Sequence, residues 1–143
     1  MSQSPKKVSC VCGAVTIETA KIAEHFHACH CGTCRQWGSA AFMAIECPEG
    51  LTISGEENVK RFSSSEWAER GFCLQCGTHL FYHLKDSPIY HLSLGLLNPE
   101  HSEFAHQYFI DQKPNYYEFG NPTKMLTGEE LFKLFTESPS PKE

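Results

Sequence analysis

Hydrophobic positions along most of this chain come in short runs. From residue 8 to about residue 119 the runs are rich in Val, Ile, Thr, Phe and Tyr, and Gly, Pro, Asn and Ser interrupt them at regular intervals. The candidate strands cover residues 8–12, 14–19, 24–31, 40–47, 51–54, 81–84, 89–97 and 104–110. The first two flank Gly13 as the arms of a bend. The pattern predicts a mainly β protein.

Near its end the chain has the pattern of a helix. The sequence TGEE at residues 127–130 has the residue order of a capping box, and Leu131, Leu134 and Phe135 then fall on one helical face. This predicts a short C-terminal helix over about residues 128–136 that packs on the sheet. The first six or so residues and the last six, SPSPKE, are polar and rich in Pro and Ser, so we expect loose tails.

Length and composition restrict the class of protein. A chain of 143 residues with 20% charged residues is typical of one folded, soluble domain. No apolar run approaches the roughly 18 residues of a membrane span, and the start, MSQSPKKVSC, lacks the apolar stretch of a signal peptide. We therefore expect a cytoplasmic protein that makes no membrane contact.

The charge pattern disfavours nucleic acid as a partner. The formal net charge is -5, and the 12 lysines and arginines are scattered along the chain. A protein that follows a phosphate backbone needs a basic stripe, which this pattern does not provide.

The eight cysteines are the strongest chemical feature of the sequence. The cytosol keeps thiols reduced, so metal ligands or reactive thiols are favoured over a disulfide framework. Seven of them form three groups: Cys10 with Cys12, Cys29 with Cys31 and Cys34, and Cys73 with Cys76. Residues two apart on a strand face the same side, so the first two groups can each direct two sulfurs at one ion. The third group, a C-x-x-C followed by Gly77, is typical of a zinc knuckle.

Seven thiolates divide into four and three. Structural zinc takes four protein ligands, whereas three ligands leave a position for water or for a substrate sulfur, and zinc is the usual metal for thiolate sets. The spacing does not decide which groups combine, and a histidine can also complete the shorter set. The eighth cysteine, Cys47, has no partner at ligand spacing, and we expect a buried, inert thiol there.

Three segments resemble one known family. SCVCGAV (9–15), CHCGTCRQWGS (29–39) and GFCLQCGTHLFY (71–82) are similar, in the same order, to the motifs of the glutathione-dependent formaldehyde-activating enzyme-like family, which includes centromere protein V. A weaker likeness runs through HLSLGLLNPE (91–100), so the resemblance covers about residues 8–120. Seven cysteines at three matching spacings make the likeness specific.

The resemblance implies a fold and a division of the ligands. The fold is β-tent-like, with antiparallel sheets around a structural zinc and a short C-terminal helix, in a single zinc-binding domain over residues 1–143. It implies two zinc ions per chain. The structural zinc would lie on Cys10, Cys12, Cys73 and Cys76, and the second on Cys29, Cys31 and Cys34. The sequence differs from the family pattern at two places. Asn98 stands where the family has aspartate, and Tyr116-Tyr117 stand near the position of an expected tryptophan. These differences bear on the identity of the substrate more than on the fold.

Taken together, the open three-thiolate site and the family resemblance imply a carbon–sulfur lyase. Zinc held by three thiolates is a weak Lewis acid, but it can take up an incoming thiol, lower its pKa and hold it as thiolate. The resemblance implies glutathione as that thiol and formaldehyde as the small electrophile, as in S-hydroxymethylglutathione synthase. The alternatives are a non-catalytic carrier of glutathione or its conjugates, and a structural zinc interaction module. A thiol-disulfide oxidoreductase is disfavoured, since the C-x-x-C at residues 31–34 is not set in a βαβ pattern.

Several neighbours of the cysteines have both a functional and an ordinary interpretation. Arg35 can bind the thiolates or a glutathione carboxylate, or it can be a structural arginine. His25 and His27 alternate in phase with the cysteines of their strand, where one can transfer protons, although packed or exposed histidines are more common. His30 should face the opposite side, and a ligand role for it is disfavoured. Trp37 can form the wall of the site or belong to the core.

Overall fold

The computed structural model describes residues 5–137 and divides the chain into two compact units. The first unit contains the residues up to 24 together with 44–102, and the second contains 25–43 together with those from 103 onward. The expected C-terminal tail, and most of the N-terminal one, lies outside the described residues. None of the described helices is both long and apolar enough to cross a membrane.

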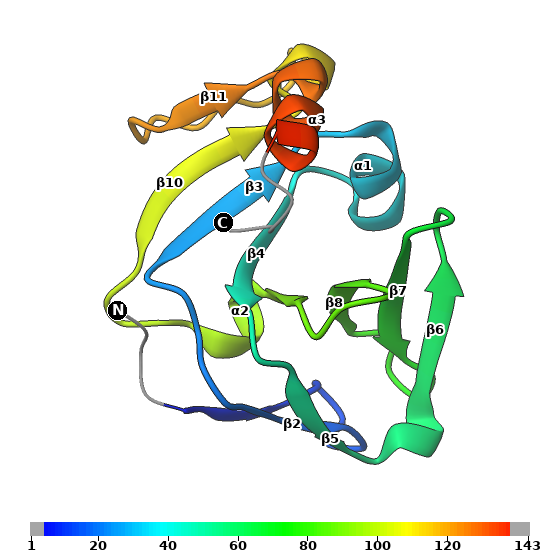
Figure 1. Cartoon of the computed structure of the whole chain (residues 1–143). Helices are drawn as coiled ribbons and strands as arrows, with labels where there is room; N and C mark the ends of the chain where they lie inside the picture. Colours follow the sequence, from blue (N-terminus) through cyan, green and yellow to red (C-terminus); the bar gives the residue numbers. More distant parts are fainter. Residues whose placement is uncertain (1–4, 138–143) are drawn as a thin grey trace. The chain divides into compact units, whose positions relative to one another are not determined.

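A three-stranded antiparallel sheet forms one part of the first unit (Figure 1). Its strands, in the order β1-β2-β5, are β1 (Lys7–Ser9), β2 (Thr16–Thr19) and β5 (Leu51–Ser54). Ile17 points into the core and is 1% exposed, as expected for a strand with one buried face. Gly55, which follows β5, has φ +84°, and a Cβ there would collide with the backbone oxygen of Ala14, so the turn requires glycine.

The larger set of strands in the first unit is also antiparallel. In the order β4-β9-β8-β7-β6, the strands are β4 (Phe42–Cys47, in this unit from Ala44 on), β9 (Tyr90–Ser93), β8 (His79–Leu84), β7 (Ala68–Cys73) and β6 (Val59–Ser63). A short 3-10 helix, η1 (Glu56–Asn58), precedes β6. Phe81 and Leu92 are fully buried, and the Phe81 ring packs on Gly71, where a Cβ would overlap the ring. The core of this unit therefore lies on the β7–β8–β9 strands.

The strands of the second unit run parallel. β3 (His25–Cys29), β10 (Glu103–Tyr108) and β11 (Lys124–Leu126) lie side by side in Figure 1, with β10 between the other two. Both pairings of β10 are parallel, which differs from the antiparallel sheets expected from the family. Parallel neighbours need a long connection, and residues 30–102 separate β3 from β10.

Three helical segments complete the second unit. They are α1 (Gly32–Gly38), the 3-10 helix η2 (Ile110–Gln112) and α3 (Gly128–Glu137). The predicted capping box is confirmed: the Glu130 N–H donates to Thr127 Oγ1 (3.1 Å), and the Thr127 N–H donates to Glu130 Oε1 (2.8 Å). The C-terminal helix therefore begins where its sequence predicts.

The run at residues 89–97 was expected to be a single strand, which is wrong for its second half. The strand β9 stops at Ser93, and the chain turns into the short helix α2 (Leu94–Leu97). Asn98 ends this helix with φ +45°, and its N–H donates to the Leu94 oxygen (2.9 Å). Asparagine tolerates this left-handed conformation, which gives Asn98 a structural role.

Candidate metal centres

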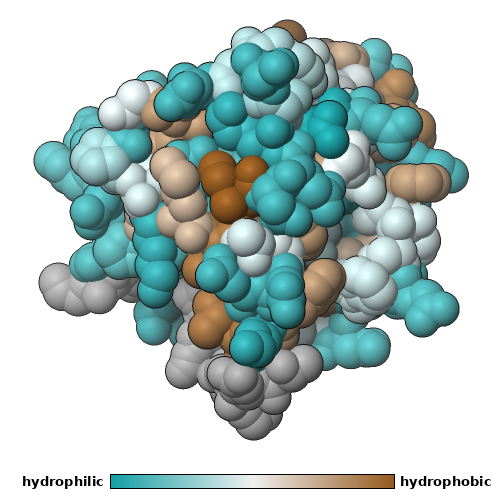
Figure 2. Space-filling model, turned by 90° about the horizontal axis from the view of Figure 1, so that it is seen from above, coloured by the Kyte–Doolittle hydropathy of each residue, from teal (hydrophilic) through white to brown (hydrophobic). Residues whose placement is uncertain are grey.

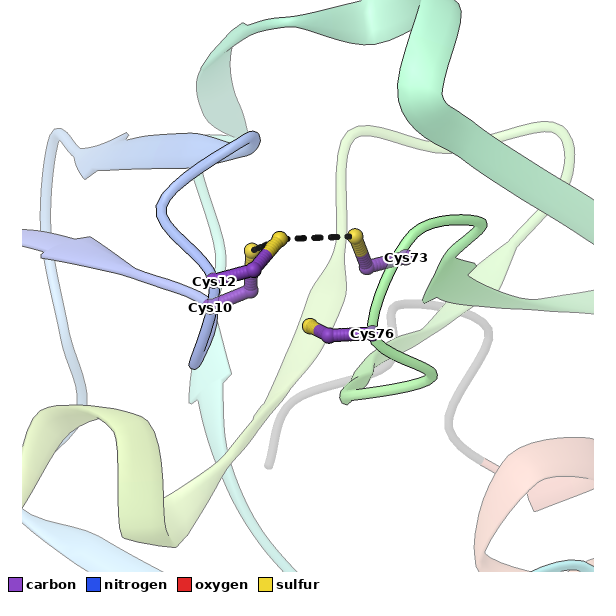
Figure 3. A group of neighbouring side chains, drawn as sticks. All are labelled: Cys10, Cys12, Cys73 and Cys76. Carbon is purple, nitrogen blue, oxygen red and sulfur yellow. Dashed lines mark hydrogen bonds between the residues drawn. The ribbon is translucent and has the colours of Figure 1, made fainter.

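Four cysteines from two distant turns of the first unit point toward one another. Cys10 and Cys12 come from the turn after β1, whereas Cys73 ends β7 and Cys76 lies in the turn that leads to β8 (Figure 3). All four Sγ atoms lie within 4.8 Å of one another. We call this set the four-cysteine cluster. Cys10 and Cys73 are buried, whereas Cys12 and Cys76 are exposed.

The first pair of sulfurs is positioned by a turn. The expectation that Cys10 and Cys12 share a strand face is wrong, because β1 ends at Ser9. Backbone hydrogen bonds from Cys10 to the Val15 oxygen (3.0 Å) and from Gly13 to the Cys10 oxygen (3.1 Å) close the turn. The Val15 N–H also donates to Cys10 Sγ (3.4 Å), which favours a thiolate there.

The second pair forms the predicted knuckle. The Gly77 N–H donates to the Cys73 oxygen (2.8 Å), and the Gln75 N–H donates to Cys73 Sγ (3.3 Å). Hydrogen bonds from the hydroxyl and the backbone of Thr78 lower the pKa of Cys76 to about 5. This turn therefore stabilises sulfur in the ionised form that binds metals.

The sulfur spacing of the four-cysteine cluster fits a tetrahedral zinc ion. Cys12 Sγ lies 3.7 Å from Cys10 Sγ and 3.9 Å from Cys73 Sγ. Zinc–sulfur bonds of about 2.3 Å at tetrahedral angles place sulfurs about 3.8 Å apart. Both of these distances match the spacing that a tetrahedral zinc ion requires.

A second set of sulfurs lies in the second unit. Cys29, Cys31 and Cys34 have their Sγ atoms within 4.8 Å of one another, and we call them the three-cysteine cluster. The expectation that Cys29 and Cys31 share a strand is wrong, since β3 ends at Cys29 and Cys31 is the N-cap of α1. Cys31 Sγ accepts a hydrogen bond from the Cys34 N–H (3.4 Å), so helix capping positions two of the three sulfurs.

The three-cysteine cluster also has the electrostatics of a cation site. Hydrogen bonding with Cys31 and Cys34, followed by burial, raises the pKa of Cys29 well above its usual range. Three crowded thiols resist ionisation because the thiolates that would form repel one another. A divalent cation relieves that repulsion. Among the residues that the structure describes, no fourth His, Cys, Asp or Glu belongs to this group.

His30 lies between two of these cysteines but does not complete the set. It is fully buried, with Nδ1 2.8 Å from the Tyr117 hydroxyl and Nε2 2.8 Å from Gln107 Oε1. The amide of Gln107 donates to Thr123 Oγ1 (2.9 Å), so its oxygen faces His30 and receives the Nε2 proton. Burial and the charges of Lys113 and Arg35 lower the pKa of His30. The imidazole is therefore neutral, and both of its nitrogens are occupied.

The other two histidines of this strand make contacts away from the cluster. His25 is exposed, and its Nδ1 lies 3.6 Å from Glu103 Oε1. The ring of His27 is half-buried, with its centre 4.7 Å from that of Tyr108. Both histidines were expected on the metal-facing side of the strand. Neither belongs to the group of possible ligands that contains Cys29.

Arg35, Trp37 and Cys47 also have defined places. Arg35 is half-buried, and its Nε donates to the His30 backbone oxygen (3.0 Å). Trp37 packs edge-on against Phe42, with ring centres 5.5 Å apart, which favours the core interpretation. Cys47 belongs to neither cluster and is buried, as expected, and burial raises its pKa to about 12, which disfavours a reactive thiolate.

Two glutamines that contact the cysteine-bearing loop were not identified from the sequence. Gln107 orients His30, and Gln112 Oε1 accepts a hydrogen bond from the Gly32 N–H (2.9 Å). Each pairs with a residue about 80 positions away, so no local pattern identifies them. Tyr117 was noted only as a departure from an expected tryptophan.

Comparisons with known proteins agree with the cysteine pattern. A model of the family described as glutathione-dependent formaldehyde-activating enzyme matches residues 5–112. An uncharacterized lyase of Schizosaccharomyces pombe is 37% identical over 127 residues, which cover 87% of this chain and 93% of the relative. A crystal structure of a Rhodobacter sphaeroides protein has a TM-score of 0.57 and 26% identity, and the match covers 66% of this chain and 90% of that one. The chain thus belongs to the glutathione-dependent formaldehyde-activating enzyme family.

Proposed function

We propose that this protein is a zinc-dependent carbon–sulfur lyase that joins a thiol such as glutathione to a small aldehyde such as formaldehyde. The observation that carries the proposal is the three-cysteine cluster, whose sulfurs converge without a fourth ligand from the described part of the chain. Family membership and the lyase from Schizosaccharomyces pombe support the same class of reaction.

Each cluster has a separate role in this proposal. Cys29, Cys31 and Cys34 would hold one zinc ion, which lowers the pKa of an added thiol and keeps it as thiolate. The four-cysteine cluster would hold a second, structural zinc that joins turns 61 residues apart. Tyr117 would fix the side chain of His30, and the backbone bond from the His30 N–H to the Tyr108 oxygen (3.0 Å) would fix the chain between Cys29 and Cys31. Arg35 would bind a carboxylate of glutathione.

The proposed reaction needs no oxidant or reductant. The thiol sulfur forms a bond to the carbonyl carbon while the π bond of the carbonyl group breaks. The carbonyl oxygen receives the proton that the thiol has lost. With glutathione and formaldehyde the product is S-hydroxymethylglutathione, and the reverse reaction releases both.

Native mass spectrometry of the zinc-loaded protein, with and without glutathione, tests the proposal. We expect two zinc ions per chain and a glutathione adduct. The adduct should disappear in Cys34→Ser and persist in Cys47→Ala, which removes a cysteine outside both clusters. NMR with labelled formaldehyde should show that the wild-type protein accelerates formation or breakdown of the adduct relative to buffer. Cys34→Ser should give no acceleration.

Other results would favour the other functions. An adduct without acceleration of the reaction indicates a carrier of glutathione or its conjugates. Two zinc ions without an adduct indicate a structural zinc module, and either result contradicts the lyase.

A further inference from the structure

Two cationic side chains from different parts of the second unit lie around His30, the residue between Cys29 and Cys31. Arg35 donates from Nε to the backbone oxygen of His30 (3.0 Å). Lys113, directly after η2, places its Nζ 5.3 Å from the centre of the Tyr117 ring. The Tyr117 hydroxyl lies 2.8 Å from His30 Nδ1, so both cations lie around the residue between two of the cysteines.

Backbone and side-chain contacts fix the position of Lys113. The preceding residue, Gln112, accepts a hydrogen bond from the N–H of Gly32, inside the cysteine-bearing loop (2.9 Å). The Lys113 N–H donates to the Ile110 oxygen (3.2 Å), and its Nζ donates to the Pro114 oxygen (2.9 Å). The side chain is half-buried, and its position is therefore restricted.

The charges of Arg35 and Lys113 are not balanced by the protein. Neither makes an ion pair with a carboxylate among the side chains that the structure describes, whereas Arg61 pairs with both Glu56 and Glu69. A zinc ion with three thiolates carries a single net negative charge, which one cation offsets. Before a thiol binds, the second cation is therefore in excess, and this excess suits an anionic ligand.

We propose that Lys113 binds a carboxylate of the thiol co-substrate and makes the site selective for thiols that carry one. The inference rests on the function proposed above. Glutathione has a carboxylate at each end, so Arg35 and Lys113 each have one to bind. The family match ends at residue 112, directly before this lysine.

Binding of two thiols to variants of the zinc-loaded protein tests the inference. The probes are glutathione and N-acetylcysteamine, a thiol without a carboxylate, and isothermal titration calorimetry gives both dissociation constants. We expect Lys113→Gln to weaken glutathione binding about tenfold, the effect of losing one charge-assisted hydrogen bond, and to leave N-acetylcysteamine within about twofold. Lys113→Arg should retain the selectivity. Lys124→Gln, at an exposed lysine of β11, should change neither value.

Three results would overturn the inference alone. They are unchanged glutathione binding in Lys113→Gln, equal weakening of both thiols, and loss of zinc from this variant. The last two would mean that Lys113 only offsets the charge of the cluster. If neither thiol binds the wild-type protein, the proposed function fails, and the inference fails with it.

Discussion

Glu69 of the first unit shows how single contacts control stability in acid. Its Oε2 accepts hydrogen bonds from Arg61 Nη1 and His83 Nδ1, both at 2.8 Å. Burial would raise the pKa of Glu69, but the hydrogen bonds from His83 and Arg61 outweigh burial and lower it. Since the folded pKa lies below the unfolded value of about 4.3, ionised Glu69 stabilises the fold at neutral pH.

We expect this stabilisation to be complete above the unfolded pKa and to disappear as the pH falls through the folded pKa. Glu69→Gln should lower the free energy of unfolding by about 1–3 kcal/mol at pH 7 and flatten its decline in acid. Urea denaturation at a series of pH values measures both effects. Glu49→Gln, in an exposed pair with Lys21 (3.2 Å), is the control and should change the stability by less than about 1 kcal/mol. Equal loss in both variants would contradict the assignment to Glu69.

The clustered cysteines were predictable from the sequence, but their surroundings were not. Cysteine spacing identified all seven clustered sulfurs because metal ligands follow local rules of turn and helix geometry. Gln107 and Tyr117 hold His30 across 77 and 87 residues, and such contacts exist only once the sheet has formed. The neutral state of His30 therefore follows from the structure alone.

At the scale of elements, the contribution of the N-terminal cap to the stability of α3 can be tested with a matched control. Glu130 accepts the Thr127 N–H, and the neighbouring Glu129 is also exposed but makes no such bond. We expect Glu130→Ala to lower the local free energy of opening of α3 by about 1 kcal/mol, because the first turn loses one capping partner. Hydrogen exchange of the α3 amides measures it. Glu129→Ala should change exchange much less, and equal effects would mean that only helix-terminal charge matters.

Element prediction succeeded where alternation or capping is strong. The strand at residues 51–54 has the predicted bounds, and α3 begins within its predicted range. The strands β6 and β7 were missed because their sequences, VKRFS and AERGFC, contain charged residues and glycine. They form strands through pairing with each other and with β8, which is a tertiary effect.

At the scale of the molecule, the two clusters should differ in what their loss does. A structural zinc contributes on the order of 10 kcal/mol in small zinc-binding peptides, and the four-cysteine cluster joins turns 61 residues apart. We expect Cys76→Ser, or treatment with a chelator, to abolish cooperative unfolding of the first unit. Cys34→Ser should stay folded, as should the control Cys47→Ala. Thermal unfolding followed by circular dichroism makes the comparison, and a Cys76→Ser protein that melts like the wild type would contradict a structural role for this cluster.

The surface gives no sign of a large apolar interface on the face drawn in Figure 2. Small brown areas lie between larger teal ones there. The exposed large hydrophobic residues come from separate parts of the sequence, as in Val11, Phe62, Trp67 and Tyr116. Single exposed hydrophobic side chains are common on folded proteins and need no partner.

The order of the two clusters along the chain has a consequence for biosynthesis. All three sulfurs of the three-cysteine cluster leave the ribosome within residues 29–34, whereas the four-cysteine cluster waits for Cys76. The pairing of β3 with β10 comes later still, because β10 is synthesised only after residue 102. A nascent chain therefore exposes the thiols of the three-cysteine cluster to cellular metal before either unit can fold around them, and the edge of β3 that pairs with β10 stays unpaired until β10 is made.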